Sequence, residues 1–148
     1  MRFSRMRIAI AAAALLSTPM IAAAACCPSD GNGIQLAKSG LGESLPDTLN
    51  LSQDPSWQVY GFQRDGITYF QVNDLTGQVK LIVGTLDNVF WTLPAGKSPA
   101  KTSLPSQRLV IPANAPRQVV YRRAEFSLVV YGKGADAIWS VELPGEGQ

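Results

Sequence analysis

The feature that most constrains this fold is the alternation of apolar and polar side chains over residues 57–93, which three turn signals interrupt. Successive side chains of a β-strand point to opposite faces, so this alternation indicates strands with one buried face. Asp65-Gly66 is a strong signal for a two-residue hairpin loop. With that loop, the expected pairs are Arg64 with Ile67, Phe62 with Tyr69, Gly61 with Phe70, and Val59 with Val72.

Two further turns extend this hairpin into a four-stranded antiparallel meander. A four-residue loop over 74–77 predicts the pairs Val72–Val79, Phe70–Leu81 and Thr68–Val83. A five-residue loop over 84–88 predicts the pairs Val83–Val89, Leu81–Trp91 and Val79–Leu93. Because a slip by one residue moves every side chain to the other face, this register defines one apolar face. Its expected members are Trp57, Val59, Phe70, Val72, Val79, Leu81, Val83, Val89, Trp91 and Leu93.

The rest of the chain predicts loops and short strands. Residues 94–107 contain three prolines and two lysines, which favours a surface connection rather than a strand. Further strands are expected over Arg108–Ile111, Arg117–Arg123, Phe126–Tyr131 and Ala137–Leu143. Residues 57–148 are therefore predicted to form a single all-β domain. It is an antiparallel meander that continues into a small β-sandwich or barrel of about seven to eight strands, with little helix.

Residues 1–25 have the order of a secretory signal peptide: a basic start, an apolar run over 8–16, and small residues before Cys26. The apolar run is shorter than the roughly 20 residues that span a bilayer, so no transmembrane span is expected after cleavage. Residues 26–56 are expected to form a polar, loop-rich segment ahead of the domain. We predict a periplasmic or secreted protein. The alternative is a lipid-anchored protein with Cys26 as the acylated first residue, and membrane contact is expected only in that case.

Composition removes several classes of chemistry. The chain contains no histidine, which excludes histidine-based triads, general bases and metal sites. Its two cysteines are adjacent, at positions 26 and 27, so they cannot join distant segments. Ser98 and Lys101 match the S-x-x-K spacing, but they lie in a proline-rich stretch where the helix of that motif cannot form. We therefore expect no catalytic residue, no metal, no cofactor and no enzyme activity.

The charge balance also bears on the partner. Removing Arg2, Arg5 and Arg7 with the signal takes the 13 basic residues to ten against 11 acidic ones, a net charge of −1. The basic character thus belongs to the signal, and no nucleic-acid partner is expected.

The second face of the meander mixes aromatic with polar side chains, which is typical of recognition surfaces. The candidate partner-binding residues are Tyr60, Phe62, Tyr69 and Phe90 on this face, with Lys97 and Lys101 in the proline-rich connection. The alternative is that a second sheet or the N-terminal segment covers these aromatics.

Two functional hypotheses follow from these observations. The first is an exported, non-enzymatic binding protein of the cell envelope, such as an inhibitor or immunity-type protein acting on an envelope enzyme. The second is a structural or accessory subunit of a larger envelope assembly, anchored at Cys26 and pairing through an exposed strand edge. In both hypotheses the partner is another protein of the cell envelope.

Overall fold

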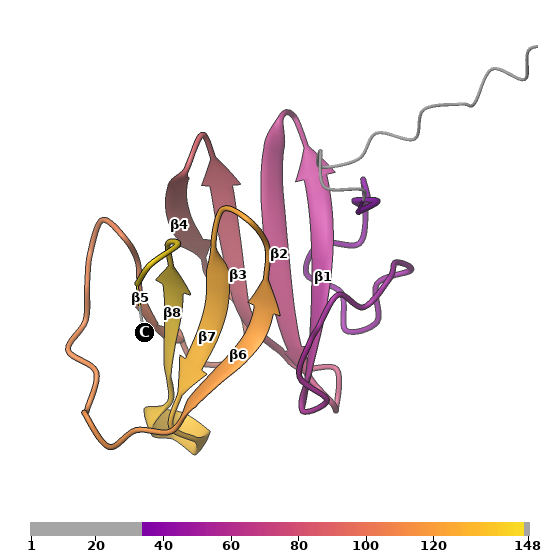
Figure 1. Cartoon of the computed structure of the whole chain (residues 1–148). Helices are drawn as coiled ribbons and strands as arrows, with labels where there is room; N and C mark the ends of the chain where they lie inside the picture. Colours follow the sequence, from indigo (N-terminus) through magenta and orange to yellow (C-terminus); the bar gives the residue numbers. More distant parts are fainter. Residues whose placement is uncertain (1–33, 147–148) are drawn as a thin grey trace, which may run out of the picture.

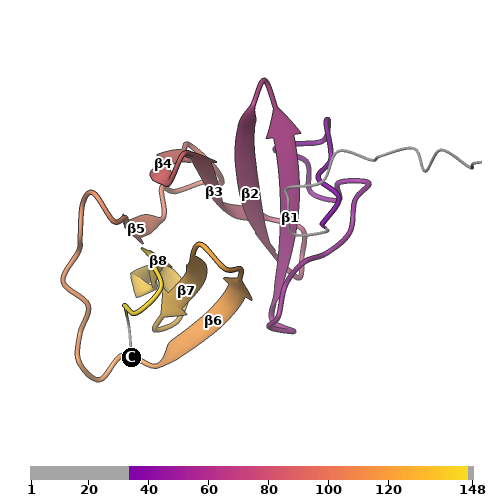
Figure 2. The same cartoon turned by 45° about the horizontal axis from the view of Figure 1, so that its top comes forward.

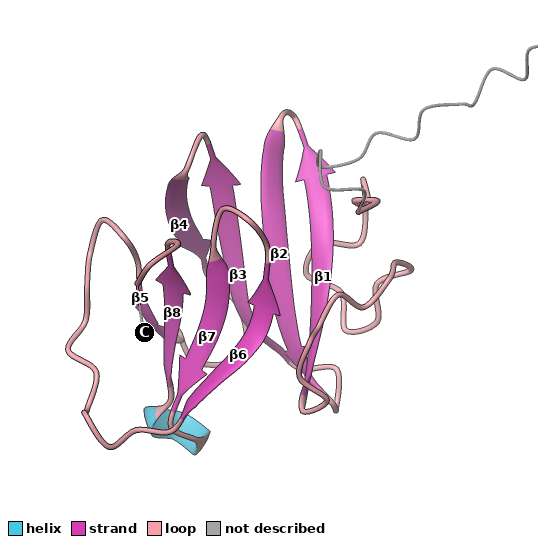
Figure 3. Ribbon diagram, in the orientation of Figure 1, coloured by secondary structure: helices cyan, strands magenta, loops and turns pink. Residues whose placement is uncertain are grey.

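The computed structural model describes residues 34–146, and these form eight strands in two sheets with a single 3₁₀ turn (Figure 1). The predicted signal peptide and the predictions on Cys26 lie outside the described residues. Within the described part, no helix has the length and apolar character needed to cross a membrane. The all-β prediction is confirmed (Figure 3).

The first sheet is the predicted antiparallel meander, in the order β1-β2-β3-β4. Its strands are β1 (Trp57–Arg64), β2 (Ile67–Asp74), β3 (Val79–Leu86) and β4 (Val89–Leu93). In the first hairpin, Phe62 pairs with Tyr69 and Val59 with Val72, so its predicted register is confirmed. Asp65 and Gly66 both have positive φ, at 53° and 81°, as a two-residue turn of this kind requires.

The second hairpin differs from its predicted register by two residues, because Val72 pairs with Leu81 and not with Val79. The side chain of Asp74 organises the loop: its Oδ1 accepts from the backbone N–H of Thr76 at 2.9 Å and of Gln78 at 3.0 Å. A register irregularity between Val72 and Asn73 accommodates the change. Since side chains alternate with a period of two, this shift keeps Leu81 and Val83 on the core face. Beyond the irregularity, Val79 pairs with Asn73 of the opposite face, so the prediction that Val79 belongs to the core face is wrong.

The third hairpin reverses a prediction. Its loop has two residues, Asp87 and Asn88, with φ of 49° and 63°, and not the expected five. Two consecutive residues in the left-handed region make the type I′ turn that matches the twist of a hairpin. Phe90 therefore points into the core, whereas Val89 is 62% exposed. Trp91 lies on the other face of β4, opposite Gly84, and the prediction that Val89, Trp91 and Leu93 belong to the core face is wrong.

The second sheet has the order β5-β8-β7-β6. Its strands are β5 (Lys101–Ser103), β6 (Arg117–Arg122), β7 (Ser127–Tyr131) and β8 (Ile138–Glu142), with the 3₁₀ turn η1 (Gly134–Asp136) between β7 and β8. Two predictions are corrected here. Residues 94–107 do contain a strand, because β5 pairs in parallel with β8. The expected strand Arg108–Ile111 is absent from the described chain, since no neighbouring strand pairs with it.

The two sheets pack face to face around one hydrophobic core (Figure 2). Aromatic rings from both sides meet in it. The ring centroids of Phe70 in β2 and Tyr121 in β6 lie 5.2 Å apart, as do those of Phe90 in β4 and Phe126. Such offset and edge contacts are favourable aromatic geometries. The core is made up of Val59, Phe70, Val72, Leu81, Val83, Phe90, Val120, Tyr121, Phe126, Leu128, Val130, Trp139 and Val141.

The segment 34–56 has no regular strand, yet it is bound to both sheets and lies beside β1 in both views (Figures 1 and 2). The backbone of Ala37 exchanges hydrogen bonds with Gly61 and Gln63 of β1, at 3.0 and 2.8 Å. Farther along, the backbone N–H of Gln53 donates to the carbonyl of Val120 in β6 at 2.8 Å. The segment therefore covers edge positions of β1 and β6.

Candidate functional site

The four aromatic residues predicted to share an open face do not form one. Tyr60 and Phe62 are only 5% and 2% exposed, in a face that the N-terminal segment covers. Phe90 lies in the core, because the two-residue turn before β4 reverses the face of that strand. Tyr69 is half-buried. The expectation of an open aromatic surface is thus wrong for Tyr60, Phe62 and Phe90, and the covered alternative describes the structure.

Gln71 and Asn73 explain how this face is covered, because both amides are fully buried and hold the segment. Gln71 Nε2 donates to the carbonyl of Glu43 at 2.7 Å, and its Oε1 accepts from the N–H of Gly42 at 2.6 Å. Asn73 Nδ2 donates to the carbonyl of Ser44 at 3.0 Å. These polar residues fix the N-terminal segment and are not free for a partner.

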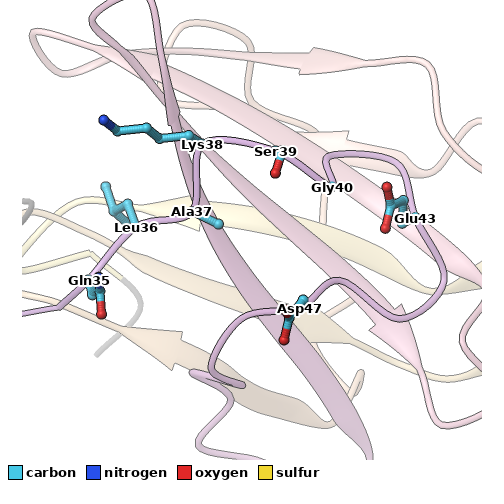
Figure 4. Close-up of a pocket in the computed structure, with 8 residues that line it drawn as sticks. All are labelled: Gln35, Leu36, Ala37, Lys38, Ser39, Gly40, Glu43 and Asp47. Carbon is cyan, nitrogen blue, oxygen red and sulfur yellow. The ribbon is translucent and has the colours of Figure 1, made fainter.

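A hollow of about 460 Å³ lies within the N-terminal segment, and all of its lining comes from residues 35–47. Figure 4 shows that Lys38 extends away from Glu43 and Asp47. No aromatic side chain lines it, and its charges do not converge. It offers little for specific recognition.

A larger cleft of about 790 Å³ opens at the end of the sandwich that carries η1, the turn drawn in cyan in Figure 3. We call it the tryptophan cleft, after Trp57 and Trp139. Both sheets contribute to it through strand ends and connecting loops, as is usual for binding sites on β-sandwiches. It is lined by Ser56, Trp57, Asp74, Lys80, Ser98, Pro99, Ala100, Lys101, Gln118, Gly132, Lys133, Gly134, Ala135, Ala137 and Trp139.

Two tryptophans form the aromatic part of the cleft. Trp57 begins β1 and Trp139 belongs to β8, and their ring centroids lie 4.9 Å apart at an interplanar angle of 76°. This edge-to-face contact joins the two sheets at the cleft. Trp139 is 4% exposed, whereas Trp57 is half-buried, so Trp57 presents the larger aromatic surface.

The charged part of the cleft is basic. Three of the five lysines in the chain line it, namely Lys80, Lys101 and Lys133. Asp74 is the one carboxylate among the lining residues, and Lys80 Nζ lies 3.0 Å from its Oδ2. The pKa of Asp74 is lowered to about 2, chiefly by the hydrogen bond from the Thr76 hydroxyl. Burial opposes this effect, and hydrogen bonds from Lys80 and from two backbone N–H groups add to it. Asp74 and Lys80 thus neutralise each other.

The other two lysines are more available. Lys101 Nζ lies 3.0 Å from Asp136 Oδ1, but both side chains are exposed, so the pair is weak. Lys133 is exposed and has no ion-pair partner among residues 34–146. Lys97 is exposed next to Ser98 of the lining. The structure therefore brings the predicted candidate Lys101 to the cleft and leaves Lys97 beside it.

The S-x-x-K spacing remains without its structural context. Ser98 and Lys101 both line the cleft, but they lie in a loop and in strand β5, not on a helix. Lys101 is paired with Asp136 at 3.0 Å. The arrangement lacks the lysine–serine contact that activates a nucleophile in that motif.

A second group of ionisable side chains lies on the outer face of the second sheet. Glu142 is 5% exposed and accepts from Arg117 Nη2 at 2.5 Å and from the Tyr131 hydroxyl at 2.6 Å. Burial, followed by the hydrogen bond to Glu142, raises the pKa of Tyr131. The carboxylate of Glu125 is bound instead to Arg123 at 2.6 Å. Each carboxylate thus has its own cationic partner.

These groups do not assemble a metal site. Within residues 34–146, no three cysteine, aspartate or glutamate side chains gather in a way that would hold a metal ion.

Sequence reasoning missed most of the cleft. It placed Trp57 on the core face, against which this residue packs, and of the three lysines that line the cleft it singled out only Lys101. The one signal was the pair Lys97 and Lys101 in the proline-rich connection. In the comparisons with known proteins, no family model, no curated protein and no solved structure matches this chain.

Proposed function

We propose that this protein is an exported, non-enzymatic binding protein of the cell envelope, and that it holds part of another protein in the tryptophan cleft. The observation that carries the proposal is the cleft itself. It combines a half-buried tryptophan with two weakly engaged lysines in a concavity of about 790 Å³. Binding sites in proteins are concave, mostly apolar, and carry a few converging polar groups.

The chemistry of the cleft favours binding over catalysis. A general acid or base works best when its pKa lies near the working pH. Asp74 has a pKa of about 2 and is held by Lys80, so it is a poor proton carrier at neutral pH. The lysines that remain act as fixed positive charges.

The location is part of the same proposal. It rests on residues 1–25, whose basic, apolar and small-residue regions follow the order of a secretory signal. An envelope enzyme that this protein inhibits is one partner that fits, because the connection carrying Lys97 and Lys101 borders the cleft. A subunit tethered through an acylated Cys26 is the alternative form of membrane association.

Capture from an envelope extract tests the proposal with paired variants. The exported protein carrying Lys101→Glu and Lys133→Glu is expected to lose at least about 90% of the specifically retained partner. Both lysines of the cleft that are available to a ligand then carry a negative charge, which repels the acidic groups that the lysines attracted. Lys38→Glu is the matched control, because Lys38 is exposed and lies outside the tryptophan cleft. Retention that survives the double variant, or that falls equally with the control, contradicts the assignment of the site.

A second function is favoured by the outer edge of β4. Segment 34–56 adds backbone hydrogen bonds to the outer edges of β1 and β6, whereas none is added to the outer edge of β4 within the described residues. This strand contains no charge and no proline, the usual features that block edge pairing. A subunit of a larger assembly would pair through it. Val89→Lys, at a position 62% exposed, is expected to abolish such assembly in light scattering and to leave capture through the cleft intact.

A further inference from the structure

We infer that the tryptophan cleft takes an acidic peptide segment, with carboxylates at Lys101 and Lys133 and an apolar side chain against Trp57. This inference rests on the proposed function and names the chemistry of its ligand. It is carried by three properties of the cleft: the sign of its available charge, the kind of cation, and the open backbone around Lys133.

The available charge of the cleft is positive while the mature chain is close to neutral. Lys80 is occupied by Asp74 at 3.0 Å and by the Gln78 side chain at 2.6 Å. Lys101 is held only by an exposed pair with Asp136, which a ligand carboxylate can replace at little cost. Lys133 has no such partner within residues 34–146. Two available cations that line the same cleft therefore match two carboxylates of a ligand.

The kind of cation narrows the ligand further. All the basic residues that line the cleft are lysines, and no arginine is among them. Arginine is the residue that recognises planar or multiply charged groups such as phosphate by paired hydrogen bonds. Lysine acts as a point charge on a flexible stem, which suits carboxylates presented at variable positions along a peptide.

The loop that carries Lys133 leaves room for a peptide backbone. Gly132 and Gly134 have φ of 78° and 67°, and a Cβ built on either would meet nothing within 4 Å. Glycine at such positions allows another chain to approach closely. The apolar lining next to it consists of small residues, Ala100, Ala135 and Ala137, together with Pro99. This leaves the surface of Trp57 as the place for one large apolar side chain.

The test measures fluorescence anisotropy of a fluorescein-labelled peptide of alternating glutamate and phenylalanine. The same peptide with glutamine for glutamate, and a third with alanine for phenylalanine, are the matched probes. The glutamate–phenylalanine peptide is expected to bind at least about tenfold more tightly than either, and to weaken as salt rises. Lys101→Gln with Lys133→Gln is expected to remove that preference for glutamate, whereas Lys38→Gln retains it.

The outcomes separate this inference from the proposed function. Equal binding of the glutamine peptide overturns the inference, because the lysines then do not select the ligand. Binding to phosphatidylglycerol vesicles but to no peptide also overturns it. If no peptide binds while capture of an envelope protein still depends on Lys101 and Lys133, the inference fails and the proposed function stands. If that capture is insensitive to both lysines, the proposed function fails as well.

Discussion

Gln71→Ala should destabilise this protein substantially, although glutamine in a β-strand alternating with apolar residues is ordinarily exposed. The side chain is 0% exposed and lies beneath the N-terminal segment. It makes three hydrogen bonds: to Gly42 N–H at 2.6 Å, to the Glu43 carbonyl at 2.7 Å, and to Asn73 Oδ1 at 2.9 Å.

The magnitude follows from these bonds. Each intramolecular hydrogen bond contributes about 0.5–1.5 kcal/mol net, so three lost together amount to roughly 1.5–4.5 kcal/mol. Part of the loss is recovered, because Gly42 lies at the surface and the Glu43 carbonyl keeps a bond from Asn73 Nδ2 at 3.3 Å. Asn73 Oδ1 remains buried and loses its donor. We therefore expect a decrease of about 2–3 kcal/mol in the free energy of unfolding.

Urea unfolding followed by tryptophan fluorescence measures this change. The reporter is suitable because Trp57 and Trp139 join the two sheets. Gln107→Ala is the matched control, since Gln107 is exposed, and its cost is expected to stay below about 0.5 kcal/mol. A loss for Gln71→Ala as small as that of the control would refute the covered face, and with it the role of segment 34–56 in the fold.

The remaining predictions concern the hairpins. Phe90→Ala is expected to lower the free energy of unfolding by about 3–5 kcal/mol in denaturant melts, because Phe90 lies in the core. Thr92→Ala is expected to lower it by under about 0.5 kcal/mol, because Thr92 is exposed. Equal losses would contradict the two-residue turn and support the five-residue loop. Gly84→Ala should lower stability by about 1–3 kcal/mol in the same assay, since its Cβ would lie 2.5 Å from the Trp91 ring, and a neutral result would contradict that contact. The pKa of Asp74 is lowered from 3.8 to about 2, so its stabilising effect is complete above about pH 4 and is lost as the pH falls through 2. Asp74→Asn should therefore be less stable than the wild type at pH 6 and nearly equal at pH 2, and a difference independent of pH would exclude this cause.

The hairpins show how far local sequence can specify register. Asp65-Gly66 defines its turn by backbone preference alone, and the pairing of β1 with β2 follows. Asp87-Asn88 forms a turn of the same length, but the nearby Gly84 favoured a longer loop. The alternation could not decide between them, because Val89, Phe90 and Trp91 are all apolar and either face of β4 satisfies the pattern.

The second sheet was harder to predict from the sequence because its pairing is non-local. The strand β5 has three residues between prolines, so its own sequence favours a connection. It becomes a strand because β8, more than thirty residues later, supplies parallel backbone partners, such as Trp139 for Thr102. Arg108–Ile111 is the converse case, in which a favourable strand sequence has no such partner. Local propensity is a weak guide where the partner strand decides.

Sequence by itself determined the all-β class, the four-stranded meander and its first register, because turn chemistry and a period of two act between neighbours in the chain. Tertiary structure decided that the second face of the meander is covered. Gln71 and Asn73 read as solvent-facing residues, and only the docking of residues 42–44 makes them buried. Tertiary structure also made the tryptophan cleft, since Trp57 and Trp139 lie at opposite ends of the domain sequence and meet at 4.9 Å only when the sheets pack. Packing between distant segments leaves no periodic signal in the sequence, which is why the cleft had to be found in the structure.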